Sequence, residues 1–297
     1  MPVFPTGSGR GAKGPSTPFG ALLLLLFLAG LGVVGAQLWS GRSYYLTPVA
    51  ERARHEQYWE LKPGGSRGLV FGAAGLAMMT LMHVYSARKR LKPLHGLGPL
   101  KRWLDFHILL GIFGPLFVVL HSSFKVGGLV AVSFWAMVAV ALSGVAGRYL
   151  YRQIPRTRAG EALTLAETKA KALDLGRRLQ EDFGLDAGVL APPEQKARRR
   201  GLLRALAHVM WQDLSGAERR RLRAETAGLA LPPTDLREVR AVLAQKGALD
   251  RRIALWDELH GLFDWWHVIH KPFAIVMYVF VVVHVCVAAA TGYAWAR

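Results

Sequence analysis

Hydrophobic residues fall into five uninterrupted blocks, separated by polar and charged stretches. Each block holds about 20 residues with almost no charge, enough for an α-helix rising about 1.5 Å per residue to cross a bilayer core of about 30 Å. Tryptophans stand near the block ends, where their amphipathic rings favour the headgroup region. The pattern predicts an all-α polytopic membrane helix bundle with five spans, over residues 19–39, 68–86, 105–123, 128–147 and 271–292.

A long polar insertion, residues 148–270, separates the fourth block from the fifth. Arg, Ala, Leu and Glu dominate it, and the proline pairs Pro192-Pro193 and Pro232-Pro233 divide it, which is typical of short amphipathic helices. Ser215, with Glu218 three residues on, makes a capping-box pattern and predicts a helix start. We expect four regions: an N-terminal leader (1–18), spans one to four (19–147), a basic helical cytoplasmic domain (148–270), and the fifth span with the C-terminus (271–297).

Positive charges in the short connections predict how the spans are oriented. The connection between the second and third spans carries six basic residues, whereas the one between the third and fourth carries only Lys125. Because Lys and Arg accumulate on the cytoplasmic side, we expect an integral protein of a bacterial inner membrane, with its N-terminus and insertion in the cytoplasm and its C-terminus outside. Segment 40–67 opposes this assignment mildly, since it carries five basic residues on the outer side. The first block could alternatively be a signal peptide cleaved after Val34-Gly35-Ala36.

Composition narrows the chemistry that the chain can support. Lys and Arg number 38 against 20 Asp and Glu, a formal net charge of +18, and basic runs such as 219–221 suit anionic lipid, an acidic protein or plain solvent exposure. The single cysteine, Cys286, lies inside the fifth block. One cysteine excludes a disulfide framework, a zinc knuckle, a cysteine-ligated iron–sulfur cluster and a covalent CxxCH haem.

Histidines inside the spans carry the clearest functional signal, because ionisable residues are costly in a membrane. His107 and His121 lie fourteen residues apart in the third span, and His270 and His284 lie fourteen apart in the fifth. On an α-helix this spacing is about 21 Å along the axis and roughly 40° short of four full turns, so each pair shares one face. Two such helices running in parallel would offer paired imidazoles at two levels, which is what two non-covalent b haems need as axial ligands.

Neighbouring residues refine this prediction. Gly111 and Gly114 lie within about 40° of the His107 direction and would leave room for a flat macrocycle. His267 competes with His270, although it lies about 100° from the His284 direction, because Pro272 could alter the local helix geometry. His83, in the second span, could approach a haem or a quinone, or be merely interfacial. Basic residues at the inner boundary could pair with haem propionates or simply anchor the helices: Arg102, Arg148 and Lys271.

The paired His-x13-His helices resemble the dihaem b cytochromes, both the cytochrome b of quinol-oxidising complexes and the transmembrane domain of ferric reductases and NADPH oxidases. The ferric-reductase type is closer, because its third and fifth spans carry the ligands. The resemblance implies that His107 and His270 hold an inner haem, and His121 and His284 an outer one. It covers little more than the ligand helices: the sixth span and a flavin- or nicotinamide-binding sequence are missing, and the insertion is additional.

These observations predict transmembrane electron transfer by a dihaem cytochrome b subunit of an oxidoreductase complex, of the kind found in respiratory chains. The donor would be a quinol or a cytoplasmic redox protein, the acceptor an extracytoplasmic cytochrome or metal ion, and a quinone is a candidate further cofactor. We expect membrane lipid and other redox subunits or cytochromes as partners, and no nucleic acid. The alternative is a non-redox membrane scaffold that presents its basic helical domain to lipid or protein, with the histidines serving helix packing.

Overall fold

The protein is all-helical. The computed structural model describes residues 18–128, 130–155, 163–185, 211 and 215–293, and the expected leader (1–18), Pro192-Pro193 and the last four residues lie wholly or almost wholly outside this part. Helix accounts for 82% of the structure, and the described residues form no strand. The predicted fold class is therefore confirmed.

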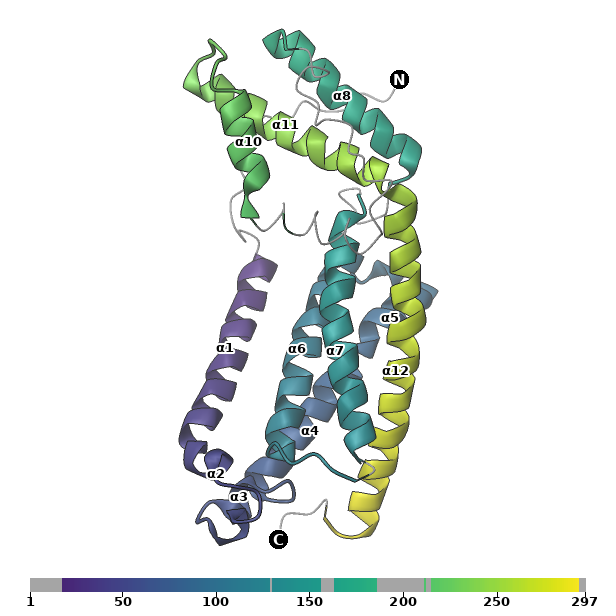
Figure 1. The fold of residues 1–297 in the computed structure, drawn as a ribbon. Coiled ribbons are helices and arrows are strands. Elements are labelled where there is room, and N and C mark those ends of the chain that lie inside the picture. The colour runs from purple at the N-terminus through teal and green to yellow at the C-terminus, as the bar shows by residue number, and fades with distance from the viewer. Residues whose placement is uncertain (1–17, 129, 156–162, 186–210, 212–214, 294–297) are drawn as a thin grey trace. The chain divides into compact units, whose positions relative to one another are not determined.

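Among the described residues, five helices are long and apolar enough to span a membrane, which indicates a membrane protein. They coincide with the five hydrophobic blocks, but the last one begins much earlier than its block, because Pro272 lies inside the helix and does not start it. A proline within a long apolar helix is tolerated where neighbouring groups satisfy the freed carbonyl. The helices are α1 (Pro18–Ser40), α4 (Ser66–Leu81) continued by α5 (His83–Arg90), α6 (Leu100–Ser122), α7 (Val130–Gln153) and α12 (Trp256–Ala290) (Figure 1).

The chain divides into two compact units. The first, which we call the histidine unit, comprises residues 1–144 and 270–297, and the second, the insertion unit, comprises residues 145–269. Helices α7 and α12 each contribute to both. All four predicted ligand histidines fall in the histidine unit, because the boundary in α12 lies between Ile269 and His270.

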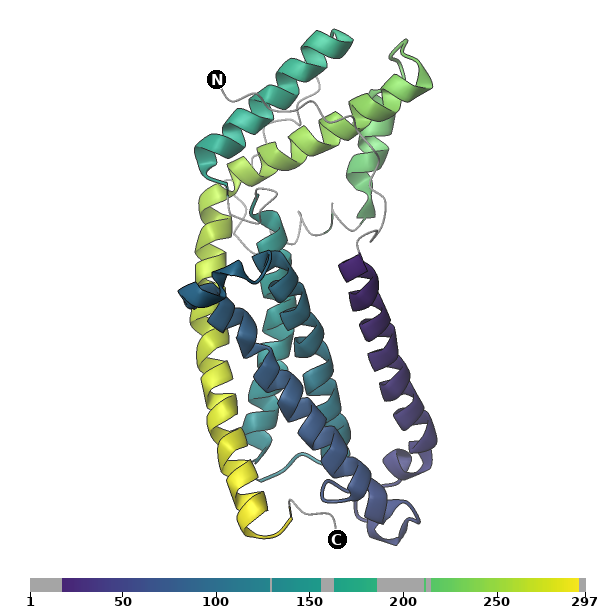
Figure 2. The same ribbon diagram turned by 180° about the vertical axis from the view of Figure 1, so that it is seen from behind.

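Small residues bring α4 close to α6 in the histidine unit (Figure 2). A Cβ on Gly75 would lie 3.0 Å from the Gly114 carbonyl oxygen, so the two backbones meet almost directly. Glycine at such crossings allows the close van der Waals packing that associates helices in lipid. The other helices join around this pair: α1 through the rings of Phe27 and Phe113, 5.6 Å apart, and α7 and α12 through a buried cluster of Met79, Ala136, Met137 and Met277.

One end of the histidine unit is covered by residues 41–65, which we call the cap. It contains α2 (Arg42–Leu46), a 3₁₀ turn (Arg52–Arg54) and α3 (Tyr58–Leu61). Tyr44 and Leu61 are almost completely buried there. The cap is therefore a folded part of the unit and not a loose connection.

The insertion unit has a hydrophobic core of its own. It packs α8 (Leu165–Phe183), α10 (Ala217–Glu225) and α11 (Pro233–Ala254), whose apolar faces meet through Ala172, Leu175, Leu179, Leu222, Val239, Val242, Leu243 and Leu249. Amphipathic helices are expected between residues 148 and 270, and α8, α10 and α11 are present there.

The capping box predicted at Ser215 does not form. Gly216 is the N-cap of α10, with no side-chain capping bond, and Glu218 instead forms an ion pair of 2.5 Å with Arg251 of α11. A complete capping box stands at the start of α8, where Thr164 and Glu167 bond reciprocally to each other's backbone N–H groups. The tertiary ion pair thus removes Glu218 from the local pattern.

Candidate paired-histidine site

His121 of α6 and His284 of α12 face each other. Their ring centres are 6.3 Å apart, with the ring planes at 62°. Metal–imidazole bonds are about 2.0–2.1 Å long, and each ring centre lies roughly 1 Å behind its nitrogen, so two imidazoles on opposite sides of one metal have centres about 6 Å apart. The spacing of this pair therefore fits a single metal ion bound between the two rings.

The orientation of the His121 ring is set by α4. Its Nδ1 lies 2.9 Å from the carbonyl oxygen of Gly68. A Cβ on Gly72, one turn later on α4, would stand 2.7 Å from that same Nδ1. Because a helical side chain covers the turn before its own Cα, the missing side chain of Gly72 exposes the Gly68 carbonyl to the ring. With Nδ1–H donating to this carbonyl, Nε2 keeps the lone pair that a metal needs.

His107 is anchored in the same way, at the junction of α4 and α5. Its Nδ1 lies 3.0 Å from the carbonyl oxygen of Met82, the residue between the two helices. The ring also packs against Tyr85, with centres 5.3 Å apart. The helix break makes the Met82 carbonyl accessible, and its bond to Nδ1–H again leaves Nε2 as the free ligand nitrogen.

His270 of α12 is anchored by a side chain of α7. The Ser143 hydroxyl donates to the Val140 carbonyl oxygen at 2.9 Å, and the same Oγ lies 2.7 Å from Nδ1 of His270. Since the hydroxyl proton is directed at Val140, the oxygen accepts the Nδ1–H of the histidine. His107 and His121 thus have Nδ1 occupied by a backbone carbonyl, which leaves Nε2 as the ligand nitrogen, and Nδ1 of His270 contacts the hydroxyl of Ser143. A hydrogen-bonded Nδ1 is typical of metal-binding histidines.

The two helices that carry the histidines run in the same direction (Figures 1 and 2). Since His121 meets His284, stepping back fourteen residues on each helix brings His107 and His270 to a second level, about 21 Å away along the axes. The ring centres of the first pair lie 6.3 Å apart, whereas His107 is anchored at Met82, between α4 and α5, and His270 at Ser143 of α7. That His107 and His270 share one haem stays a prediction.

The two glycines of α6 lie in different surroundings. A Cβ on Gly111 would meet no atom within 4 Å, so its face is open. Gly114 lies against α4, where a Cβ would be 2.8 Å from Cγ of Met79. The face of α6 at Gly111 is therefore free of close neighbours, while Gly114 serves the contact between α6 and α4.

The alternative histidines make other ring contacts. His83 begins α5 and packs against Tyr278 of α12, with ring centres 4.7 Å apart. His267 belongs to the insertion unit, where its ring contacts Phe263 and Trp266, and its Nδ1 lies 2.8 Å from the Phe263 carbonyl oxygen one turn back. The structure thus links His270, and not His267, to the anchor on α7.

Sequence reasoning missed the groups that hold the rings. Gly68 and Gly72 form a G-x-x-x-G pattern in an apolar segment, a signal of close helix packing that could have been noticed. Nothing in the sequence distinguishes Ser143 from other serines in the spans. Arg88, one of the six basic residues that predict the orientation, is buried, and its Nε has no hydrogen-bond partner in the described part of the chain.

The basic residues expected at propionates have other contacts. Arg102 lies over the ring of Phe19, and Arg148 lies over the ring of Tyr151. Within the described residues, no three His, Cys, Asp or Glu side chains gather into a metal site. No protein-family model matches this chain, and no curated protein or solved structure is significantly similar to it.

Proposed function

We propose that the protein is a membrane cytochrome of the b type, in which two bis-histidine haems carry electrons across the membrane. The observation that carries the proposal is the opposed pair His121 and His284, 6.3 Å between ring centres on two parallel apolar helices. The anchored Nδ1 atoms of His107, His121 and His270 support it, because they fix the tautomer that a metal ligand requires.

Haem suits this donor set better than a bare metal ion does. Protein zinc sites take three or four protein ligands, whereas haem iron obtains four nitrogens from the porphyrin and needs only two axial ligands from the protein. Each level here offers two imidazoles, the number that haem lacks. The apolar porphyrin would also replace side chains between helices, and the open face at Gly111 gives it space.

Bound haem iron would supply reversible one-electron transfer, each electron accepted at one level leaving at the other. The protein's part is to fill both axial positions with imidazole, which favours electron transfer over oxygen binding. Burial in a helical bundle excludes water. The buried Arg88, on the same side of the unit as His107, would neutralise the negative charge of the haem carboxylates.

The proposed orientation of the protein in the membrane follows the distribution of basic residues. The His107 and His270 level lies toward the cytoplasm and the His121 and His284 level toward the outside, with the C-terminus outside. A quinol or cytoplasmic redox protein would donate electrons, and an extracytoplasmic cytochrome or metal ion would accept them. The likeness to the haem-carrying domain of ferric reductases is part of this proposal and rests on the same four histidines.

Spectroscopy and haem counting test the proposal. The purified full-length protein, produced with adequate haem, should show b-type bands in reduced-minus-oxidised spectra and about two haems per chain. The His284→Ala variant should lose about half of this haem. His95 is exposed and lies in the connection before α6, so His95→Ala is the matched control and should keep both haems. A folded, colourless protein, or unchanged haem in His284→Ala, would contradict the proposal.

A scaffold function is the second candidate, and one feature of the insertion unit favours it. The unit has its own core, and α10 exposes four arginines, which could bind anionic lipid or an acidic protein. They are Arg219, Arg220, Arg221 and Arg223. Absence of haem from a folded preparation, together with binding to vesicles of anionic phospholipid that is lost when these arginines become glutamine, would establish the scaffold instead.

A further inference from the structure

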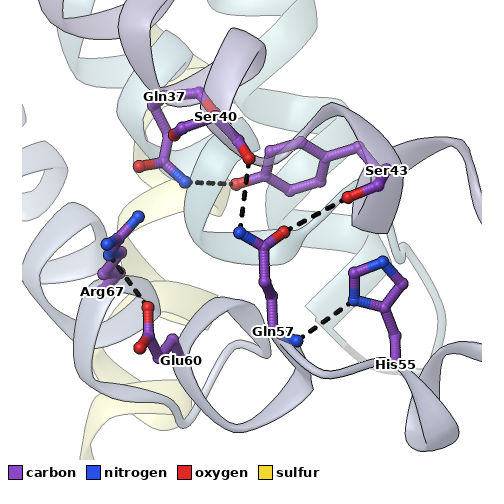
Figure 3. A network of polar contacts seen from close by, with 8 residues as sticks. Gln37, Ser40, Ser43, His55, Gln57, Glu60 and Arg67 are labelled. Atoms are coloured by element: carbon purple, nitrogen blue, oxygen red, sulfur yellow. Dashed lines mark hydrogen bonds and ion pairs between the residues drawn. The ribbon is translucent and has the colours of Figure 1, made fainter.

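The cap is tied together by polar contacts between segments distant in sequence. Figure 3 shows Gln57 between Ser40 and Ser43, with the ring of His55 accepting the Gln57 backbone N–H. Gln37, near the end of α1, donates to the hydroxyl of Tyr45 at 2.9 Å. This network holds the cap against the end of α1 and gives its inner face a defined structure.

Arg52 lies at the centre of this cap and is only 7% exposed. Its guanidinium donates to three backbone carbonyls: Nε to Thr47 at 2.8 Å, Nη2 to Tyr45 at 2.8 Å and Nη1 to Ser123 at 2.5 Å. It also lies 5.2 Å from the centre of the Tyr44 ring. A cation with this many specific partners is built into the fold and is not a flexible surface charge.

The bond to Ser123 brings Arg52 close to the His121 level. Ser123 is the C-cap of α6 and stands two residues after His121, with a left-handed backbone at φ 49°. Its hydroxyl donates to the Leu61 carbonyl, a second tie between α6 and the cap. A Cβ on Gly64 of the cap would lie 3.8 Å from the ring of Tyr293, three residues after the end of α12. The cap thus bonds to the end of α6 and lies close to the segment that follows α12.

The charge of Arg52 is not neutralised by a nearby anion. No carboxylate in the described part of the chain lies within 4.0 Å of its guanidinium, whereas Arg67 of the same unit forms an ion pair with Glu60 at 3.2 Å. Burial raises the pKa of the Tyr44 hydroxyl, so this tyrosine stays neutral and does not offset the charge of Arg52. A full positive charge therefore remains buried beside the end of α6.

We propose that Arg52 raises the reduction potential of the haem held by His121 and His284. The inference rests on the proposed function and extends it to the relative potentials of the two haems. Reduction adds one negative charge to the haem, and a buried cation nearby stabilises that reduced form, since the low dielectric and the exclusion of water leave the interaction poorly screened. A higher potential at this level favours electron flow from the His107 and His270 level toward the cap.

Potentiometric titration of the full-length, haem-loaded protein tests this role. Arg52→Gln removes the charge, and Arg52→Lys keeps it while losing the forked geometry. Arg54 lies in the same 3₁₀ turn and is exposed, so Arg54→Gln is the matched control for loss of one positive charge at the surface. Thermal unfolding of the haem-free variants measures the structural contribution of Arg52 separately.

In Arg52→Gln, one haem should shift to lower potential while the other stays unchanged, and Arg52→Lys and Arg54→Gln should keep wild-type potentials. Equal shifts in Arg52→Gln and Arg52→Lys, or none in Arg52→Gln with both haems retained, would overturn the inference. If Arg52→Gln does not fold, the test uses Arg52→Lys, which keeps the positive charge. A lowered haem potential in Arg52→Lys would also overturn the inference. Wild-type protein that binds no haem would overturn the proposed function as well, so the two failures are distinguishable.

Discussion

The imidazole of His121 occupies the place where Gly72 would carry a side chain. A methyl group at Gly72 would stand 2.7 Å from Nδ1 of His121, a separation that Cβ atoms essentially never show in folded proteins, and 3.0 Å from Cε1, which is tighter than most contacts. The ring therefore reaches the Gly68 carbonyl only because α4 carries no side chain at residue 72. Gly72 of α4, a helix that carries none of the predicted ligands, thus sets the orientation of the candidate ligand His121 on α6.

Gly72→Ala should accordingly reduce haem binding without removing any ligand. The new Cβ pushes the ring away from Gly68, so Nε2 no longer points at the position shared with His284. We expect loss of about half of the bound haem, measured as haem per chain. Gly35→Ala is the control, because a Cβ at Gly35 in α1 meets no atom within 4 Å. Full haem in Gly72→Ala would show that the Gly68 bond is dispensable.

The choice between His267 and His270 leads to a second prediction. Only His270 is held by α7, through the 2.7 Å contact between its Nδ1 and the Ser143 hydroxyl oxygen. His270→Ala should therefore lose one haem, whereas His267→Ala should keep both, as judged by absorbance per chain. The reverse result would make His267 the ligand and would require α12 to turn between these positions.

Ser143 should act as a positioning residue for His270. Removing a hydrogen-bond partner of a metal-ligating histidine typically lowers metal affinity about 10–100-fold, so Ser143→Ala should retain haem that much more weakly, while Ser143→Thr should restore binding. Haem loss to apomyoglobin measures the effect. Ser133→Ala is matched, since Ser133 also joins α7 to α12, by donating to the Met277 carbonyl oxygen at 3.1 Å. Equal weakening in both variants would point to helix packing instead.

The capping box at α8 gives a prediction for the insertion unit. Thr164→Ala should lower the free energy of unfolding by about 1 kcal/mol, the usual cost of losing a threonine N-cap. Ser215→Ala should have a smaller effect, because Ser215 is not the cap of α10. Chemical denaturation followed by the helical circular dichroism signal compares the two. A larger loss in Ser215→Ala would restore the capping box predicted from the sequence.

The same box makes the stability of this unit depend on pH. Hydrogen bonds from the backbone and side chain of Thr164 lower the pKa of the Glu167 carboxyl. Its stabilising effect is therefore complete above the ordinary glutamate pKa and is lost as the pH falls through the lowered value. Glu167→Gln should remove this part of the pH dependence of unfolding, and an unchanged pH profile in that variant would contradict the assignment.

The helices and the spacing of the histidines along them follow from the amino-acid sequence alone. Apolar blocks of membrane-spanning length must satisfy their backbone groups internally, so they form helices whatever their neighbours are, and the 3.6-residue repeat then places His107 with His121 and His270 with His284. The sequence does not predict where α12 begins, since Pro272 resembles a helix start.

Which helix faces meet depends on the packing of the whole fold and could not be predicted from the sequence. His121 bonds to Gly68, which is 53 residues away in the sequence, and His270 contacts Ser143, which is 127 residues away. Arg52 bonds to the Ser123 carbonyl, 71 residues away. These contacts depend on small residues that let particular backbones approach, and on a cap that folds back over α6. Glycine, serine and arginine occur in many other places in the chain, so their roles come from packing and not from local pattern.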